Sequence, residues 1–304
     1  MTYEIIQGEY PDGTSYELRK PMHAFYDLTY GEMASEVQTS PRIANQIIGL
    51  GLLEAISDDI ILVNEDVLDT NNDGISGKSN RVWNILEQET QIGRFGWKAT
   101  HPTVLQQTAS AFIGDIGITN KLFPEQNCTD IQIDCHEGFD TETHEINFDD
   151  LIKTAKYCAT TAVPVRRNVD NQDVLKGKEI FKTIGCNGCH VEKYTTGNHS
   201  SIPELSHQII RPYTDLLLHD MDTELADGRP EFLANGREWK TPPLWGIGLF
   251  EIVNNHTCYL HDGRARNLEE AILWHGGEAE HIITSYKHLK VVERNQLIQF
   301  LNSL

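Results

Sequence analysis

The sequence predicts a mainly α-helical fold whose N-terminal portion is irregular and partly β. Two stretches predict the helices, because apolar residues recur at spacings of three and four over 174–184 and again over 291–304. A third stretch predicts the β structure. Residues 3–19 form two alternating runs on either side of Pro11-Asp12-Gly13, which is typical of a β-hairpin.

The stretch Cys186-Asn187-Gly188-Cys189-His190 follows the first apolar stripe directly. Its Cys-x-x-Cys-His pattern attaches c-type haem: two thiols bond to the vinyl groups, and the imidazole takes an axial position on the iron. Cys-x-x-Cys alone also occurs in redox dithiols and zinc sites, but zinc needs a second ligand pair, and none follows at matching spacing. We therefore predict one covalent haem c on Cys186, Cys189 and His190.

The helix before this motif has an apolar face that suits close packing. The face consists of Val174, Gly177, Phe181 and Ile184. Gly177 lets another helix cross closely, as the first and last helices of cytochrome c domains do, and the helix over 291–304 is available for that crossing. We therefore expect a cytochrome c-like haem domain over 166–304, with residues 1–165 as a separate N-terminal portion.

The N-terminal portion contains further candidate helices. Apolar periodicity indicates one over 41–56, and others are expected over 102–115 and 148–163. Pro164 ends the last of these, so residues 165–172 are a plausible domain linker.

Composition limits the partners of the chain. Its 304 residues are enough for two domains, and 25 basic against 45 acidic residues give a formal net charge of −20. This charge argues against nucleic acid and anionic membrane surfaces, and favours a basic redox partner protein such as a small cytochrome or cupredoxin. The alternative is an acidic protein whose charge steers no partner.

The predicted haem also bears on location. No stretch is long and apolar enough to span a bilayer, and the start of the chain lacks the basic and apolar regions of a signal peptide. Attachment of c-type haem generally takes place outside the cytoplasm. We therefore expect a mature or truncated piece of a periplasmic or otherwise exported protein.

Four cysteines remain after the haem pair. Cys128 and Cys135 bracket a short polar loop and are expected to form a local disulfide, which leaves Cys158 and Cys258 as a long-range pair. The alternative is four reduced, buried thiols.

A possible calcium loop lies in the N-terminal portion. Oxygen side chains at Asp69, Asn71 and Asp73, followed by Gly74, match the first half of an EF-hand loop. The twelfth position is Asn80 rather than Glu, so a Ca²⁺ site and a metal-free Asx-rich turn both remain open.

Motifs after the haem pattern resemble a known superfamily. Thr-Pro-Pro-Leu-Trp-Gly at 241–246, Leu-His-Asp-Gly-Arg-Ala-Arg at 260–266 and Leu-Glu-Glu-Ala-Ile at 268–272 are similar to the bacterial di-haem cytochrome c peroxidases and methylamine-utilisation maturases. Residues 93–99, 115–120, 213–221 and 274–279 look like the related di-haem oxidoreductases sometimes labelled thiol oxidoreductases. That family has two c-type haems, whereas this sequence has one Cys-x-x-Cys-His, so residues 1–165 are expected to be the remainder of a peroxidase-like domain without its first haem motif.

The resemblance implies roles for particular residues. In the peroxidases electrons enter at the C-terminal haem and pass to the N-terminal haem, where peroxide is cleaved, so His190 would ligate the electron-transfer haem. Its sixth ligand would be Met221, with His219, His261, a tyrosine or an open site as alternatives. Trp97 resembles the tryptophan that relays electrons between the haems.

Other roles implied by the resemblance concern polar residues. Gln107, or its neighbour Gln106, and Asp115 fall where peroxidases place polar groups beside the reacting haem. Arg264 and Arg266 would bind the haem propionates, the alternative being surface salt bridges. The predicted function is a peroxidase-like di-haem oxidoreductase. The alternatives are a mono-haem electron-transfer module without catalysis and a calcium-stiffened interaction domain.

Overall fold

The structure is a computed structural model that describes residues 1–137 and 144–304. Helices hold 32% of the chain and strands 14%, so the fold combines α and β structure, with helix the larger part. The mainly α prediction is thus confirmed in part. No helix within the two described ranges is long and apolar enough to cross a membrane.

The described strands form four separate antiparallel pairs rather than one sheet. The pairs are β1 (Thr2–Glu9) with β2 (Ser15–Met22), β3 (Arg81–Asn84) with β4 (Glu89–Ile92), β5 (Tyr194–Thr195) with β6 (Ile209–Ile210), and β7 (Leu218–Asp220) with β8 (Glu238–Lys240). The predicted hairpin at the start of the chain is confirmed as β1 and β2. Its turn uses Gly13 at a φ of 84°, a conformation that favours glycine.

The helices are mostly short. They are α1 (Leu50–Glu54), α2 (Asp58–Leu62), α3 (Val104–Ile116), α4 (Ile133–Glu137), α5 (Phe148–Thr160), α6 (Gln172–Thr183), α7 (Phe250–Asn254), α8 (Leu268–Leu273), α9 (Glu280–Lys287) and α10 (Val291–Ser303). Several begin at a side chain that accepts a hydrogen bond from a first-turn amide, as Asn171 does for α6. The helices predicted over 102–115 and 148–163 are confirmed as α3 and α5.

The helix predicted over 41–56 is wrong for most of its length, because only α1 forms there. The backbone of Ile43 is instead used in long-range hydrogen bonds. Its N–H donates to the His261 carbonyl, and its carbonyl accepts from the Trp97 indole. Gly49 then adopts a φ of 69° immediately before α1, which fixes where the helix begins.

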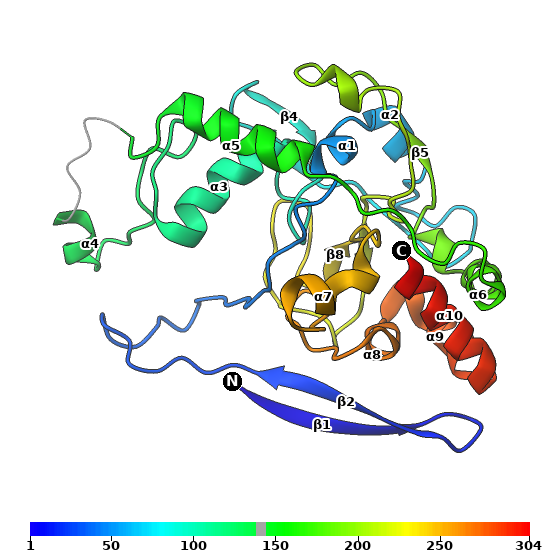
Figure 1. Ribbon diagram of the computed structural model, residues 1–304. Coiled ribbons are helices and arrows are strands. Elements are labelled where there is room, and N and C mark those ends of the chain that lie inside the picture. Colours follow the sequence, from blue (N-terminus) through cyan, green and yellow to red (C-terminus); the bar gives the residue numbers. More distant parts are fainter. Residues whose placement is uncertain (138–143) are drawn as a thin grey trace.

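The crossing predicted at Gly177 is confirmed. A Cβ built on Gly177 would lie 2.0 Å from the Gln296 carbonyl oxygen and 2.8 Å from Phe300 Cβ, so α6 and α10 touch through the missing side chain. One turn further along α6, the rings of Phe181 and Phe300 lie 5.3 Å apart. Figure 1 shows the two helices side by side near the C-terminus.

The hairpin is fastened to this C-terminal part. Tyr10 donates a hydrogen bond to Glu269, and Arg294 on α10 pairs with Asp12 while its guanidinium lies 3.8 Å from the centre of the Tyr10 ring. Figure 1 shows β1 and β2 along one edge of the molecule, beneath α7 and α8. The hairpin at the start of the chain therefore packs against α8 and α10 near its end.

Both large hydrophobic clusters combine residues from either side of the predicted boundary at 165. One joins Tyr10 and Leu18 to Phe181 and Phe300, and the other joins Leu53 and further N-terminal residues to Trp245. The division into 1–165 and 166–304 remains a prediction.

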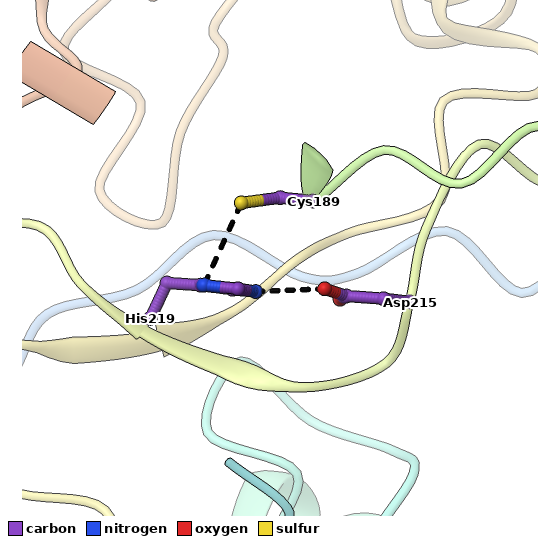
Figure 2. Close-up of side chains that lie close together, drawn as sticks. All are labelled: Cys189, Asp215 and His219. Carbon is purple, nitrogen blue, oxygen red and sulfur yellow. Dashed lines mark hydrogen bonds and ion pairs between the residues drawn. The ribbon is translucent and has the colours of Figure 1, made fainter. Parts of the chain in front are cut away.

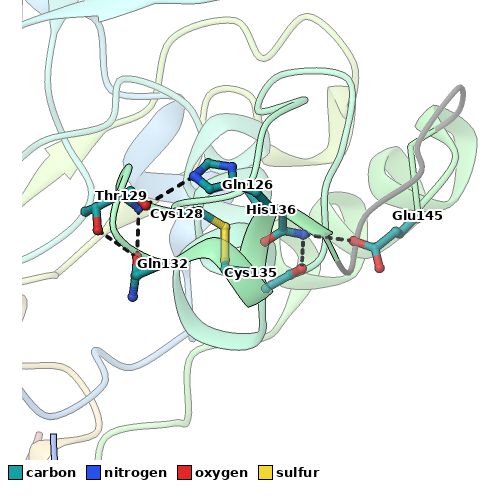
Figure 3. The surroundings of a disulfide bond; sticks show 8 residues. Gln126, Cys128, Thr129, Gln132, Cys135, His136 and Glu145 are labelled. Carbon is teal, nitrogen blue, oxygen red and sulfur yellow. Dashed lines mark hydrogen bonds between the residues drawn. A yellow bond between two sulfur atoms is a disulfide. The ribbon is translucent and has the colours of Figure 1, made fainter. Parts of the chain in front are cut away.

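The local disulfide between Cys128 and Cys135 is present beside α4 (Figure 3). Thr129 closes the same loop, donating from its N–H to Gln132 and accepting from the His136 ring. The second predicted disulfide is wrong, because Cys158 and Cys258 are both free thiols.

Gly177→Ala tests the crossing. The added Cβ would force α6 and α10 apart, and overpacking of this kind costs about 1–3 kcal/mol, against a gain of roughly 1 kcal/mol from the higher helix propensity of alanine. We expect a net fall in the free energy of unfolding and a lower Tm, measured by circular dichroism. Gly114→Ala in α3 is the control: apart from its chain neighbours and the backbone of its own helix, no atom lies within 4 Å of a Cβ built there, so the Tm should hold or rise. A Tm for Gly177→Ala that matches this control contradicts the contact.

Candidate functional site

The Cys-x-x-Cys-His motif lies on a tight turn at the end of α6. Gly185, at a φ of 99°, ends the helix, and Cys186–Gly188 then form one turn of 3-10 helix. Cys186 and Cys189 are free, partly buried thiols. Burial raises the pKa of Cys186 to about 12 and also raises the pKa of Cys189. Thiols of redox dithiols, by contrast, have lowered pKa values.

His190 is prepared for metal binding. Its Nδ1 lies 2.9 Å from the Tyr213 carbonyl oxygen, which can only accept, so Nδ1 carries the proton. Burial lowers the pKa of His190 to about 4, so the ring is neutral. No described residue hydrogen-bonds Nε2, whose lone pair is therefore available to a metal. With two free thiols beside it, this histidine fits a c-type haem.

A charged cluster lies against Cys189 (Figure 2). The ring of His219 lies 2.8 Å from the Asp215 carboxylate through Nε2 and 2.7 Å from the Glu278 carboxylate through Nδ1, and Cys189 Sγ is 3.5 Å from Nδ1. Burial lowers the pKa of His219, but the charge of Asp215 outweighs this and raises the pKa well above its ordinary value. Both nitrogens are occupied, so His219 offers no lone pair to iron.

The other predicted sixth ligands have different surroundings. Met221 packs, half-buried, against the cluster that Cys186 also contacts. His261 is stacked on Trp239 with ring centres 3.7 Å apart, and burial lowers its pKa to about 4. Met221 remains the predicted ligand.

Sequence reasoning missed His275 and Glu278. His275 follows α8 and donates from Nδ1 to the Ala271 carbonyl at 2.7 Å, while no described residue bonds its Nε2. Burial lowers the pKa of His275, as it does that of His190. The one sequence signal was their place in the motif at 274–279, which gives no spatial information by itself.

Trp97 belongs to a row of three aromatic rings, and a lysine lies over one of them. Its indole N–H donates to the Ile43 carbonyl, and its ring meets His261 edge-on at 6.4 Å. His261 stacks on Trp239, and the Lys98 ammonium lies 4.3 Å from the centre of the Trp239 ring. A continuous row of π systems therefore runs from Trp97 to Trp239.

The predicted polar groups Gln107 and Asp115 lie far apart. Gln107 lies near Gly96, and its buried Oε1 has no hydrogen-bond partner among the described residues. Asp115 is exposed at the far end of α3, eight residues or about 12 Å along the helix axis. Gln106 instead bonds the backbone of Trp83 and Ile85. Their catalytic roles remain predictions.

Arg264 and Arg266 are both held in ion pairs. Arg264 donates to Asp262 and to the Glu224 carbonyl, and Arg266 donates to Glu270 and Glu17. The ion pair of Arg264 is buried and those of Arg266 lie at the surface. Propionate binding by either residue remains a prediction.

The loop at 69–74 is closed by its own hydrogen bonds. Asp69 accepts from the N–H groups of Asp73 and Gly74, and Asn71 donates from its side chain to Asp73. These are the contacts of an Asx-rich turn. Calcium binding there remains a prediction.

Comparison with protein families decides the identity of the chain. A family model described as "Di-haem oxidoreductase, putative peroxidase" matches residues 1–304. The chain belongs to the di-haem oxidoreductase family. This confirms the resemblance, and membership of a di-haem family implies a haem cofactor.

Two further comparisons add little to the family assignment. A structure of Kuenenia stuttgartiensis hydrazine synthase pressurized with 20 bar xenon is similar at 14% identity over 94% of this chain and 99% of that chain, with a TM-score of 0.34. Similarity at that TM-score supports no conclusion. Comparison with curated proteins gave no match.

Asp227→Asn tests the ion pairs that hold Lys98 over the Trp239 ring. Asp227 pairs with Arg42 and with the fully buried Lys98. Burial raises the pKa of Asp227, but hydrogen bonds from Ser40, Arg42 and Lys98 outweigh this and lower it to about 2. Breaking a buried pair leaves an uncompensated charge, so we expect a loss of about 3 kcal/mol in the free energy of unfolding at pH 7.

The same variant has a defined pH dependence. A carboxylate with a lowered pKa stabilises the fold above its unfolded pKa of 3.8, and this contribution is lost as pH falls to about 2. The difference in the free energy of unfolding between wild type and variant, measured with urea, should therefore be largest at pH 7 and become smaller below pH 4. Asp150→Asn, in an exposed pair with Lys153, is the control and should change little. A pH-independent difference contradicts the pairing.

Proposed function

We propose that this chain is the electron-transfer part of a peroxidase-type haem oxidoreductase, with one haem c bound through Cys186, Cys189 and His190. The observation that carries the proposal is His190: its Nδ1 is fixed by the Tyr213 carbonyl and its Nε2 is open, beside two free thiols. Family membership supports haem chemistry for the whole chain.

A cytochrome c-like domain over 166–304 is part of this proposal. The contact of α6 with α10 at Gly177, directly before the haem motif, supports it. A haem bound there supplies one-electron transfer. Tyr213 orients the His190 ring, and the Phe181 ring packs beside it with ring centres 6.2 Å apart.

Electrons would leave or enter along the aromatic row. Trp97 is partly exposed at one end, and His261 and Trp239 continue it into the core. The partner we propose is a small basic redox protein such as a cytochrome or cupredoxin, since the net charge of −20 attracts basic surfaces. The location we propose is the periplasm or another compartment outside the cytoplasm, because c-type haem is generally attached there.

A second candidate is a mono-haem module that transfers electrons without catalysis. It is favoured by one observation: these 304 residues contain a single Cys-x-x-Cys-His. The two candidates differ in whether peroxide is consumed.

Absorption spectroscopy of the haem-loaded chain tests the electron-transfer proposal. We expect one covalent haem per chain by pyridine haemochrome, a six-coordinate low-spin spectrum, and no response to carbon monoxide, because both axial positions are filled. Met221→Ala should open the sixth site, giving a high-spin ferric spectrum and carbon monoxide binding. Met33→Ala, at an exposed methionine, is the control.

Two outcomes would count against these assignments. Carbon monoxide binding by the wild type rules out the electron-transfer proposal for this chain. An unchanged spectrum in Met221→Ala, together with an open site in His275→Ala, moves the sixth ligand to His275.

Trp97→Phe tests the relay. Phenylalanine keeps an aromatic ring but is harder to oxidise, so electron transfer from the ferrous haem to an oxidised partner protein should slow about tenfold, equivalent to about 1.4 kcal/mol in the barrier. The haem spectrum should not change. Stopped-flow absorbance measures the rate, with Trp83→Phe at an exposed tryptophan as control. Equal rates in the two variants would exclude Trp97 from the path.

A further inference from the structure

A long loop between β2 and α1 leaves the body of the molecule. Every residue from Met22 to Thr39 is exposed, and no helix or strand forms over 23–39. In Figure 1 this stretch, which we call the 22–39 loop, extends to the left, away from the helices. Among the described residues, the hydrogen bonds of 23–37 join members of the same stretch, as Gly31 with Leu28 and Val37 with Ala34 do. The body of the fold therefore does not hold this part of the loop.

The loop exposes large apolar side chains in close succession. They are Met22, Phe25, Tyr26, Leu28, Tyr30, Met33 and Val37. Soluble proteins rarely expose apolar groups together unless these bind a partner, and aromatic residues and methionine are enriched in protein interfaces. Long loops without secondary structure are also uncommon in compact domains, and many of them bind a ligand or a partner. The loop therefore has the composition of a binding surface.

The charged side chains of the loop all have the same sign. Three carboxylates are exposed on it, which belong to Asp27, Glu32 and Glu36. No lysine or arginine lies between Lys20 and Arg42 along the chain, and those two pair with acidic residues outside the loop. Opposite charges across an interface speed the encounter and select the partner. An apolar, acidic loop therefore suits a basic protein.

The base of the loop is bonded to the aromatic row. Ile43 donates from its N–H to the His261 carbonyl, and its own carbonyl accepts from the Trp97 indole. The guanidinium of Arg42 lies 5.1 Å from the centre of the Trp239 ring. Residues 42 and 43 thus contact all three members of the row, directly after the loop.

The other end of the row leads to the haem motif. His219 lies opposite Trp239 in the β7–β8 pair, and its Nδ1 is 3.5 Å from Cys189 Sγ. A protein bound on the 22–39 loop is therefore held at the end of the row that is distant from the haem thiol.

We propose that the 22–39 loop is the docking site of a small basic redox protein, which exchanges one electron with this chain through the aromatic row. The redox nature of the partner rests on the proposed function. In the exchange one ferrous haem of this chain is oxidised and one oxidised cofactor of the partner is reduced. No bond forms or breaks.

Calorimetry of the haem-loaded chain with cytochrome c, at low ionic strength, tests the docking. Cytochrome c is a small basic redox protein, and succinylated cytochrome c, whose lysines have become acidic, is the control partner. We expect the wild type to bind the first and not the second. Circular dichroism checks that each variant folds.

The apolar part of the surface is tested by Phe25→Ser with Tyr26→Ser. The matched control is Val291→Ser with Val292→Ser, an exposed apolar pair at the start of α10, which lies on the opposite side of the view in Figure 1. We expect the loop variant to raise Kd about tenfold and the control to change it by less than about twofold, because few contacts supply most of the affinity of an interface.

The charged part is tested by neutralising the three carboxylates of the loop. The variant is Asp27→Asn, Glu32→Gln and Glu36→Gln. The control removes the same charge from exposed positions elsewhere, with Glu125→Gln, Asp130→Asn and Asp149→Asn. We expect weaker binding and a smaller salt dependence in the loop variant than in the control. Equal effects in both would mean that only the overall charge attracts the partner, which contradicts the proposal.

Three further results overturn the proposal. The first is no binding of cytochrome c by the wild type, and the second is a Kd that Phe25→Ser with Tyr26→Ser leaves unchanged. The third is a wild-type dimer in sedimentation that this variant dissociates while partner binding stays the same, because the loop then covers a second copy of the chain. Pyridine haemochrome separates the two proposals: absence of covalent haem contradicts the proposed function, whereas the calorimetry still decides whether the loop binds a basic protein.

Discussion

The close contact of α6 with α10 at Gly177 is the constraint on which the haem motif depends. It brings Phe300 against Phe181, and Tyr213 packs edge-on against both rings at 5.7 Å and 5.9 Å. The carbonyl of Tyr213 then fixes His190. Gly177, which has no side chain, thus allows the rings of Phe181, Tyr213 and Phe300 to pack together. Through this packing it sets the orientation of the His190 imidazole, thirteen residues further along the chain.

Buried charges elsewhere in the fold are paired. His219 lies between two carboxylates, and Lys98, with no exposed surface, meets Asp227. Burying such charges is tolerated only where a partner is in hydrogen-bond contact. Other buried side-chain groups have no hydrogen-bond partner among the described residues, including the indole nitrogens of Trp245 and Trp274.

Predictions from the sequence succeeded where the interaction is local. The hairpin, the stripe that includes Gly177 and the Cys128–Cys135 disulfide all involve residues a few positions apart, or one periodic face. The helix over 41–56 failed because the backbone of Ile43 bonds Trp97 and His261, which no local pattern reveals. Glu278 was missed for the same reason: it reaches His219 across 59 positions.

His190 and His219, which both lie beside the thiols, show how the hydrogen-bond acceptor of a histidine decides its protonation state. Burial disfavours the charged form of both His190 and His219. A backbone carbonyl is a neutral acceptor, so His190 keeps its proton on Nδ1 and stays neutral with a lone pair on Nε2. The carboxylate of Asp215 is charged and outweighs burial, so His219 holds two protons and offers no lone pair. By this criterion His275, which is bonded to a carbonyl, shares the capacity of His190 to bind a metal.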